Sequence, residues 1–565
     1  MRILIIFIIS TYFLSAIEIT SSQVSNYINS YISANVDSRN KNSVNFIYSN
    51  NNYKPVWIAS DSKISKIVQL LQNLKYNYKQ KPFDIYLIKK YLYMLDNEDL
   101  SIESKIKLYA MLDIKLTNSF VSLVRFVKAG DVDWNLVKKK LKELKENNDI
   151  KAKWEISPRY MPSNSSIFSA ISSGNLDGYL DSLIPMKKRY MGLISILKKY
   201  KYKDSVKIRY GSNLKEGMSD GRIYNIKTIL KSTGDLAQNA NMSNLFDAQL
   251  KQAILSYQNR YNLKLTGEIN RVTTYYLNQP INKHIKAIIV NLDKTKLYPR
   301  SFESRHIEVN LADFKLRYYQ NSMQQLKMNV VIGKISRPTP IFDDVMKYMV
   351  VNPTWTIPDS LIKKDLIYVL KRNPKYLEEH NIYVNGKFGA KKLNMKKLFT
   401  YEHSKKRVPY SFVQYPGDEN ALGRVKFMFP NKYAVYLHDT DNKFLLERRY
   451  RIYSSGCMRV KEPFKLMKMI VGSSYNQSKI DKIIATNKPT TIHLKNPVPI
   501  HIIYFTVYQE NGKAYFKNDI YMYDKIVSES TEGNRKEYFT MPKTRLIQVD
   551  KRGNKSVYHP ERKKD

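Results

Sequence analysis

The chain has 565 residues and a strongly basic composition, which together limit the classes of protein it can be. A chain of this length is expected to form several domains, because a single core rarely grows beyond about 250–300 residues. Lysine and arginine number 94 against 50 acidic residues, a net charge of +44 that fits either a solvated surface or attraction to a polyanion. The lysines are dispersed and no nucleic-acid-binding signature occurs, so binding to nucleic acid is the weaker interpretation.

The N-terminus has the pattern of an export signal. Met1 and Arg2 precede an apolar run at residues 3–16, and polar sequence follows. A short basic start before an apolar core is typical of a secretory signal. The run is short for a membrane span, which takes about 20 residues, yet no Ala-x-Ala cleavage site follows. We therefore predict that residues 1–19 are a signal peptide or an uncleaved N-terminal anchor.

The part of the chain before residue 281 is predicted to be helical. Residues 20–50 are rich in serine and asparagine, and we expect a flexible tether there. Over residues 51–211, apolar residues recur at helical spacing, for example at 64–71 and 137–144, without any catalytic constellation. Residues 212–280 predict a separate small unit of short helices.

From residue 285 the sequence becomes richer in strands. Between residues 359 and 422 a more helical stretch interrupts the strands, where a lid over a site would be expected. A basic polar tail ends the chain at 528–565. The whole is predicted to be a multidomain α+β protein. Three alternating or β-branched stretches predict early strands: residues 287–292, 306–319 and 326–332.

The single cysteine and one histidine form the candidate catalytic pair. Cys457 follows a small turn, and His438 ends residues 433–438, which alternate like a half-buried strand. A thiolate needs a nearby base or positive field to exist at neutral pH. Backbone N–H groups around Gly456 could approach a substrate oxygen, as an oxyanion hole requires. A lone cysteine is more often a buried apolar residue, so spacing alone leaves both interpretations open.

The sequence contains no pattern typical of a metal site or of a cofactor-binding site. The remaining histidines lack the spacing of metal ligands, and no glycine-rich phosphate loop of the Walker type occurs. We predict no metal and no cofactor, so the activated nucleophile must come from the protein.

Four stretches together resemble one enzyme family. His-Asp-Thr from residue 438, followed by Ser-Ser-Gly-Cys-Met-Arg at 454–459, closely resembles the signature of the L,D-transpeptidases (YkuD domain), in which a histidine precedes a Ser-x-Gly-Cys-x-Arg/Asn block. Residues 331–340, 351–358 and 421–431 are similar to further blocks of that family. The agreement points to the large YcbB-type members. It is strong over about residues 300–525 and weaker before them.

The resemblance implies an order of domains. Residues 51–211 would form the helical scaffold domain of these enzymes. Residues 212–280 look like the common peptidoglycan-binding domain, with Tyr257 where phenylalanine is usual, so binding and a purely structural role both stay open. Residues 285–527 would be the β-rich YkuD-type catalytic domain, with residues 359–422 as a helical capping insertion.

The resemblance also implies a reaction. The Cys457 thiolate would attack the carbonyl of the third residue, a diamino acid, in a donor tetrapeptide stem, and the terminal D-Ala would leave. The side-chain amine of a second stem would then resolve the thioester, giving a 3→3 cross-link. His438 would be the general acid–base, oriented either by the Asp439 side chain or by a backbone carbonyl near it.

Further site residues follow from the same resemblance. Arg459 would hold a substrate carboxylate or fix the loop through a salt bridge, and Ser454 would orient the turn or touch the substrate. The oxyanion donors would be the N–H of Cys457 with that of Gly456 or Ser455, joined by Tyr436.

The implied partners are peptidoglycan stem peptides as donor and acceptor, together with the anionic cell wall. The implied location is the periplasm, with membrane contact only through the N-terminal anchor. Two alternatives remain. One is an L,D-carboxypeptidase or hydrolase in which water replaces the acceptor amine, and the other is a non-catalytic scaffold that binds the wall.

Overall fold

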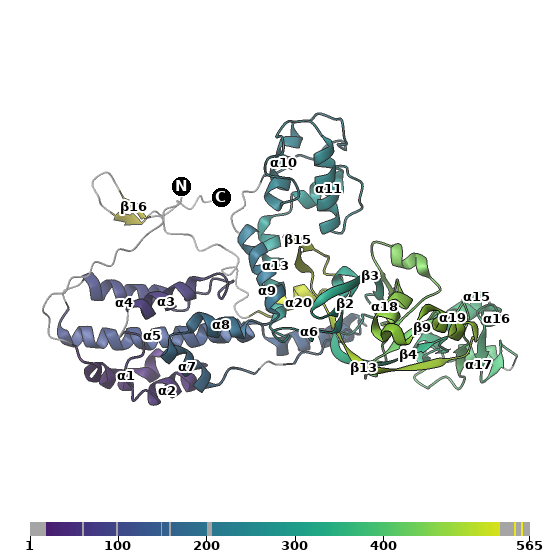
Figure 1. The fold of residues 1–565 in the computed structure, drawn as a ribbon, viewed down its shortest axis with the longest axis horizontal. Coiled ribbons are helices and arrows are strands. Elements are labelled where there is room, and N and C mark those ends of the chain that lie inside the picture. Colours follow the sequence, from purple (N-terminus) through teal and green to yellow (C-terminus); the bar gives the residue numbers. More distant parts are fainter. Residues whose placement is uncertain are drawn as a thin grey trace. The chain divides into compact units, whose positions relative to one another are not determined.

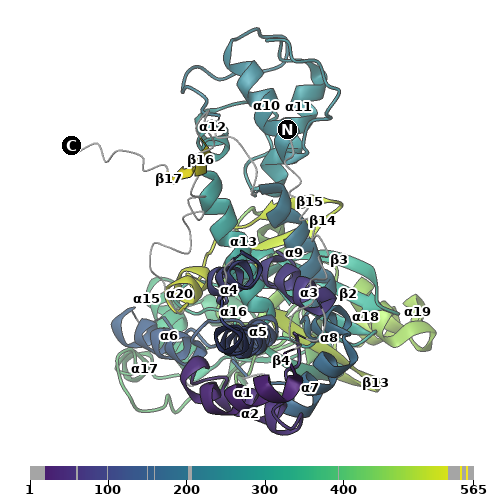
Figure 2. The ribbon, with the colours of Figure 1, turned by 90° about the vertical axis from the view of Figure 1, so that its left-hand side faces the viewer.

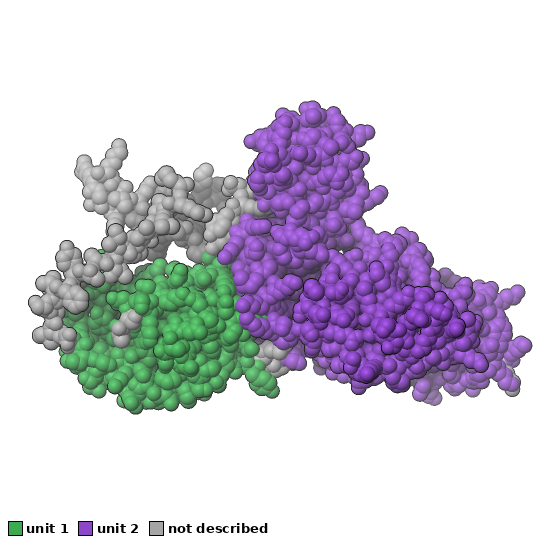
Figure 3. Space-filling view, viewed as in Figure 1, with its two compact units in different colours: residues 1–130, 159–185 green, residues 131–158, 186–565 purple. Residues whose placement is uncertain are grey.

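The chain divides into two compact units. Unit 1 holds residues 1–130 and 159–185, and unit 2 holds residues 131–158 and 186–565 (Figure 3). No described helix combines the length and the apolar character that a bilayer span needs. The predicted signal or anchor lies almost wholly outside the described residues. The computed structural model describes residues 19–58, 61–97, 100–148, 150–157, 160–200, 206–391, 393–531, 547–549 and 555–557.

Unit 1 is helical and is built around one long helix. Helix α5 (Ile102–Ala129) lies at its centre (Figure 2), because apolar residues on every side of it are buried. Its first turn is capped by Ser101, and Gly130 ends it with a φ of 70°. In the described part of this unit it is accompanied by α1 (Ser21–Asn35), α2 (Lys41–Ser49), α3 (Asp61–Gln72), α4 (Ile85–Asn97), α7 (Asn164–Ser173) and α8 (Leu176–Leu183).

The predicted flexible tether at residues 20–50 is wrong. Most of it forms α1 and α2, and α1 begins with a capping box in which the Thr20 and Gln23 side chains bond each other's backbone N–H. Val24, Ile28 and Ile32 recur every fourth residue and are buried as α1 packs on α5. The prediction was based on the serine- and asparagine-rich composition and overlooked this apolar stripe. Three apolar residues on one face are enough to hold the helix against α5.

Unit 2 opens with helices that also differ in part from the sequence prediction. Residues 287–292, predicted as a strand, lie inside helix α13. Ile288 and Leu292 are fully buried at helical spacing, and α13 packs against α9 and α20, so tertiary packing overrides the β propensity of the Ile-Ile-Val run. The remaining helices of this part are α6 (Trp134–Asn148), α9 (Lys187–Tyr200), α10 (Arg222–Thr233), α11 (Ala248–Arg260), α12 (Arg271–Leu277) and α13 (Ile281–Thr295).

Residues 212–280, predicted to be a separate small unit of short helices, contain helices α10, α11 and α12. Helices α10 and α11 lie side by side (Figure 1), and α10 ends at Gly234 with a φ of 76°. The Arg260 side chain on α11 is fully buried, pairs with Asp235 and donates to the carbonyl of Ala514. This contact ties the small unit to the hairpin of β14 (Val507–Glu510) and β15 (Lys513–Phe516).

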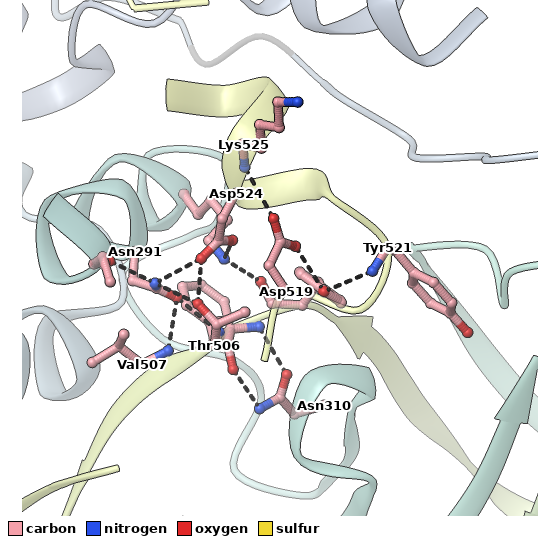
Figure 4. A network of polar contacts seen from close by, with 12 residues as sticks. Asn291, Asn310, Thr506, Val507, Asp519, Tyr521, Asp524 and Lys525 are labelled. Atoms are coloured by element: carbon pink, nitrogen blue, oxygen red, sulfur yellow. Dashed lines mark hydrogen bonds and ion pairs between the residues drawn. The ribbon is translucent and has the colours of Figure 1, made fainter. Parts of the chain in front are cut away.

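A polar network connects α13 to the chain after the central sheet (Figure 4). Asn291 on α13 accepts hydrogen bonds from the N–H groups of Thr506 (2.9 Å) and Val507 (3.2 Å). Lys294 on α13 is fully buried, donates to Tyr504 O (2.8 Å) and pairs with Asp524 on helix α20 (Tyr523–Glu529). Every member is satisfied, so this network fixes the last elements of the domain.

Among the described residues, nine strands form the central sheet, in the order β11-β3-β12-β10-β9-β4-β13-β1-β2. Strand β2 also pairs with β3, so the sheet closes on itself around the main apolar core. Helices α18 (Pro463–Val471) and α19 (Gln477–Ala485) follow β12. The strands are β1 (His306–Asn310), β2 (Lys315–Gln320), β3 (Met323–Gly333), β4 (Phe342–Val351), β9 (Val425–Met428), β10 (Leu437–His438), β11 (Ile452–Ser454), β12 (Met458–Val460) and β13 (Thr490–Ile503).

The insertion between β4 and β9 has its own core and is not purely helical. It contains a four-stranded sheet, β5-β8-β6-β7, that the sequence did not predict, because strands of two or three residues leave no periodic signal. The predicted helical insertion is therefore corrected to a mixed one, while the multidomain α+β class is confirmed. Its elements are β5 (Trp355–Thr356), α14 (Asp359–Leu361), a π-turn (Ile362–Leu366), α15 (Ile367–Arg372), α16 (Tyr376–Glu379), β6 (Ile382–Val384), β7 (Lys387–Phe388), α17 (Met395–Phe399) and β8 (Phe412–Gln414).

The end of the chain has little described structure. Beyond α20, a short hairpin is formed by β16 (Ile547–Val549) and β17 (Lys555–Val557). The rest of the predicted basic tail, from residue 532 onward, lies outside the described residues.

Candidate active site

The register of three neighbouring strands builds the site. Strand β10 runs parallel to β12, with Leu437 opposite Met458 and His438 opposite Arg459. On its other side, β10 is antiparallel to β9, with His438 opposite Lys426. Leu437 and Met458 are fully buried in the core. Because side chains alternate along a strand, His438, Arg459 and Lys426 share the opposite face of the sheet.

The same register brings Cys457 beside Tyr436. The Met458 N–H donates to the carbonyl of Tyr436 (3.1 Å), which extends the pairing one step beyond β10. The Tyr436 ring lies edge-on to the His438 ring, with 5.6 Å between the ring centres. The predicted strand at 433–438 is shorter than expected, because Ala434 adopts a left-handed conformation (φ 53°). Cys457, Tyr436 and His438 nevertheless lie on one face of the sheet.

His438 is buried and is oriented by a backbone carbonyl. Its Nδ1 lies 2.5 Å from the carbonyl oxygen of Asp439, so Nδ1–H donates and Nε2 keeps its lone pair. The Asp439 carboxylate is not the orienting group, because it pairs with Lys443 and accepts from the Arg424 N–H (2.9 Å). Only glycine fits at Gly423 (φ 59°), since an added Cβ would lie 2.4 Å from that carboxylate.

The imidazole is neutral at pH 7. Burial, together with the positive charges of Arg459, Lys426 and Lys443, lowers the pKa of His438 to about 3, against the hydrogen bond to Asp439 O, which raises it. The uncharged ring has a free lone pair on Nε2, which a general base needs, but a pKa this far below 7 makes it a weak base in the resting site.

Cys457 is a neutral thiol in the resting site. Burial raises the pKa of Cys457 to about 11, and the hydrogen bonds from Tyr436 only partly oppose this shift. Within the described part of the chain the thiol makes no hydrogen bond to the imidazole, and besides the contacts with Tyr436 it lies 4.0 Å from Ala434 O. Formation of the attacking thiolate therefore needs a base, because the positive charge of Arg459 offsets the effect of burial only in part.

The nucleophile turn, residues 454–457, is held by its own side chains. Ser454 Oγ donates to the carbonyl of Cys457 (2.6 Å) and accepts from the Gly456 N–H (3.2 Å). Ser454 thus orients the turn, and Gly456, with a φ of 126°, has no N–H left for an oxyanion. Among the described residues the N–H groups of Cys457 and Ser455 have no acceptor. They are the two predicted backbone donors that remain available.

A second turn, residues 333–339, supports the first. Thr339 is fully buried, and its Oγ1 accepts from the Gly333 N–H (2.9 Å) and donates to Gly456 O (2.8 Å). Only glycine fits at position 333, because an added Cβ would lie 2.2 Å from Arg337 O. Arg337 donates to Ser455 Oγ (2.9 Å) and to Asp365 in the insertion (2.7 Å). Sequence reasoning assigned no role to Thr339 or Arg337, although both lie in the family-like block 331–340.

Comparison with known proteins agrees with this geometry. The family model of the L,D-transpeptidase catalytic domain (YkuD) matches residues 304–499, and that of a scaffold domain matches residues 42–197. The chain contains an L,D-transpeptidase catalytic domain. Both the histidine and the cysteine of the site lie inside the matched range.

One relative and two solved structures are similar to the chain. A Haemophilus influenzae protein named "Putative L,D-transpeptidase" is 33% identical over 223 residues, which cover 39% of this chain and 45% of that protein. The chain thus spans less than half of the relative's length. The L,D-transpeptidase structures from Xylanimonas cellulosilytica and Stackebrandtia nassauensis are 10% and 12% identical, with TM-scores of 0.18 and 0.20. The match covers 98% and 97% of those two structures, and 52% and 53% of this chain.

Arg459 of the transpeptidase domain has no partner that would fix the loop. Its Nε is buried without a hydrogen bond, and no ion pair joins it to any described residue. Burial lowers the pKa of Arg459, while the nearby Asp441 opposes that shift. The salt-bridge role is thus not observed, and the side chain remains available to an anion.

Replacing Thr339 by valine is expected to destabilise the transpeptidase domain by about 1–3 kcal/mol, because it leaves two buried backbone groups unsatisfied. The loosened nucleophile turn should also acylate more slowly. Thermal unfolding and acylation rates measure both effects. Thr339→Ser keeps the hydroxyl and should stay close to the wild type, so equal losses in both variants would contradict the role of this hydrogen bond.

Alkylation of Cys457 by iodoacetamide is expected to rise with pH. Because its pKa is raised to about 11, the thiolate is scarce at pH 7 and increases about tenfold for each pH unit up to that value. Intact-protein mass at pH 6–10 gives the rate, since the chain has no other cysteine. A rate that levels off below pH 8 would contradict a neutral resting thiol.

Proposed function

We propose that the protein is an L,D-transpeptidase that forms 3→3 cross-links between peptidoglycan stems through a thioester on Cys457. The observation that carries the proposal is the parallel pairing of β10 with β12, which sets His438 and Cys457 on one face within the matched catalytic domain. The family match supports the class of reaction. The identity of the donor, the identity of the acceptor and the thioester intermediate are proposed here.

In the first step, the Cys457 sulfur attacks the carbonyl of the third stem residue while His438 Nε2 takes the thiol proton. The carbonyl of Asp439 accepts from Nδ1–H and stabilises the imidazolium that forms. The N–H groups of Cys457 and Ser455 and the hydroxyl of Tyr436 stabilise the oxyanion. One such donor typically lowers the barrier by about 3 kcal/mol.

In the second step, the tetrahedral intermediate collapses. The bond to the terminal D-Ala breaks, its amine takes the proton from His438, and a thioester remains on Cys457. The side-chain amine of a second stem then attacks the thioester, passing a proton back to His438, and the thiol is released. Arg459 binds a carboxylate of the donor during both steps.

The proposal extends to the rest of the chain. Residues 1–19 would direct export to the periplasm or anchor the protein at the membrane. Residues 212–280 would bind the cell wall, and the Arg260 contact to Ala514 supports a fixed position beside the catalytic domain. The net charge of +44 favours the anionic wall.

Incubation of the full chain with purified disaccharide-tetrapeptides tests the reaction. Release of D-Ala together with 3→3-linked dimers, detected by mass spectrometry, is the expected result. Tripeptides alone would mean that water is the acceptor and that the protein is a hydrolase. No release of D-Ala, together with retention on isolated sacculi, would mean a non-catalytic scaffold.

A further inference from the structure

Two cations flank His438, and neither has a partner in the part of the chain that the structure describes. Lys426 lies opposite His438 on β9, and Arg459 lies opposite it on β12. Both side chains are half-buried, and no hydrogen bond or ion pair is recorded for either within the described ranges. Lys426 Nζ has only the face of the Tyr436 ring nearby, 6.0 Å from its centre.

None of the described acids forms an ion pair with either cation, although the charge of the Asp441 carboxylate partly offsets that of Arg459. The Asp439 carboxylate pairs with Lys443, and that of Asp418 pairs with Arg424. Asp441 is close enough to influence Arg459, but its two oxygens accept from Thr440 Oγ1 (3.1 Å) and Asn442 Nδ2 (2.6 Å). A half-buried charge without a partner is costly, and a negatively charged ligand relieves that cost.

The spacing of the two cations suits a single anion. Neighbouring strands lie about 4.8 Å apart, so the Cα atoms of Lys426 and Arg459 are separated by about 10 Å with His438 between them. Two long side chains can converge over that distance. A guanidinium matches a carboxylate through two parallel hydrogen bonds, and an ammonium adds a point charge.

We propose that Lys426 and Arg459 form a two-cation subsite that binds a carboxylate of the acyl donor next to the attacked carbonyl. This inference rests on the proposed function and deepens it, because it makes a free carboxylate near the scissile bond a requirement of the donor. Lys426 is the new member of the site.

The subsite would also couple binding to catalysis. Both cations contribute to the lowered pKa of His438. A bound carboxylate offsets their charge, so the imidazole becomes more basic when the donor is in place. The base would therefore be strongest in the complex that needs it.

The test compares Lys426→Gln with the wild type on three tetrapeptide donors. The first donor has a free carboxylate on its terminal D-Ala and another on the side chain of its diamino acid. In the second donor only the D-Ala carboxylate is amidated, and in the third only the side-chain carboxylate of the diamino acid is amidated. The readout is kcat/KM for release of the terminal residue. Lys347→Gln removes an equal charge from an exposed position on β4 and is the matched control, while Lys426→Arg restores the charge.

We expect the wild type to prefer the free acid over one of the two amides by about tenfold or more, since a charge-assisted contact is lost with the carboxylate. That amide identifies which carboxylate binds. Lys426→Gln should lose most of this preference, and Lys426→Arg and Lys347→Gln should keep it. If Lys426→Gln prefers the free-acid donor over each amidated donor by the same factor as the wild type, the subsite is overturned. A wild type that turns over no donor would overturn the proposed function and the subsite with it.

Discussion

Replacing Cys457 by alanine is expected to lower cross-link formation and D-Ala release by on the order of 10⁴-fold or more, as loss of a catalytic nucleophile does. The side chain is small and half-buried, so the nucleophile turn, held by Ser454 and Thr339, should keep its shape. Dimers and free D-Ala, measured by mass spectrometry on purified stems, give the effect.

Two controls separate chemistry from folding. The variant should unfold at the same temperature as the wild type and should bind isolated sacculi equally well. Cys457→Ser keeps a hydroxyl with a much higher pKa and should be almost as inactive. Cross-linking that persists in Cys457→Ala would rule out a thioester and with it the proposed mechanism.

Replacing His438 by glutamine is expected to lower kcat at pH 7 by about 10²–10⁴-fold, the usual contribution of a general base. With a Cys457 pKa of about 11, the variant must rely on the small fraction of thiolate that forms without help. Its rate should therefore rise about tenfold per pH unit between pH 7 and 10. The wild-type rate should stay nearly flat there, because an imidazole with a pKa of about 3 is neutral throughout.

Acylation by a carbapenem, followed by intact-protein mass, measures both pH profiles without needing an acceptor stem. A matched control is His493→Gln, which changes an exposed histidine on β13 and should reproduce the wild-type profile. A His438→Gln profile that is also flat would mean that another group takes the thiol proton.

The candidate pair, Cys457 and His438, could be proposed from the sequence because it depends on short contiguous patterns. Cys457 stands in a small Ser-Gly-Cys turn whose glycine adopts a positive φ, and His438 ends an alternating stretch. The alternation of apolar and polar residues also predicted strands at 306–319 and 326–332. The structure has β1, β2 and β3 there.

Two elements were misjudged because their partners lie far away in the chain. Helix α13 carries a β-branched run, and only packing against α9 and α20 decides that it is a helix. Helix α1 has a polar composition, and only α5 gives its three apolar residues something to cover. Local propensity is weak compared with such burial.

By itself the sequence determined the fold class and the family resemblance, and it proposed Cys457 and His438 as a candidate pair. Only the tertiary structure decided what surrounds them: the Asp439 carbonyl orients the imidazole because Lys443 occupies the carboxylate, and Thr339 fixes Gly456 from another turn. It also placed Lys426 beside His438. Strand register decides such neighbours, and register depends on how every strand of the closed sheet pairs at once.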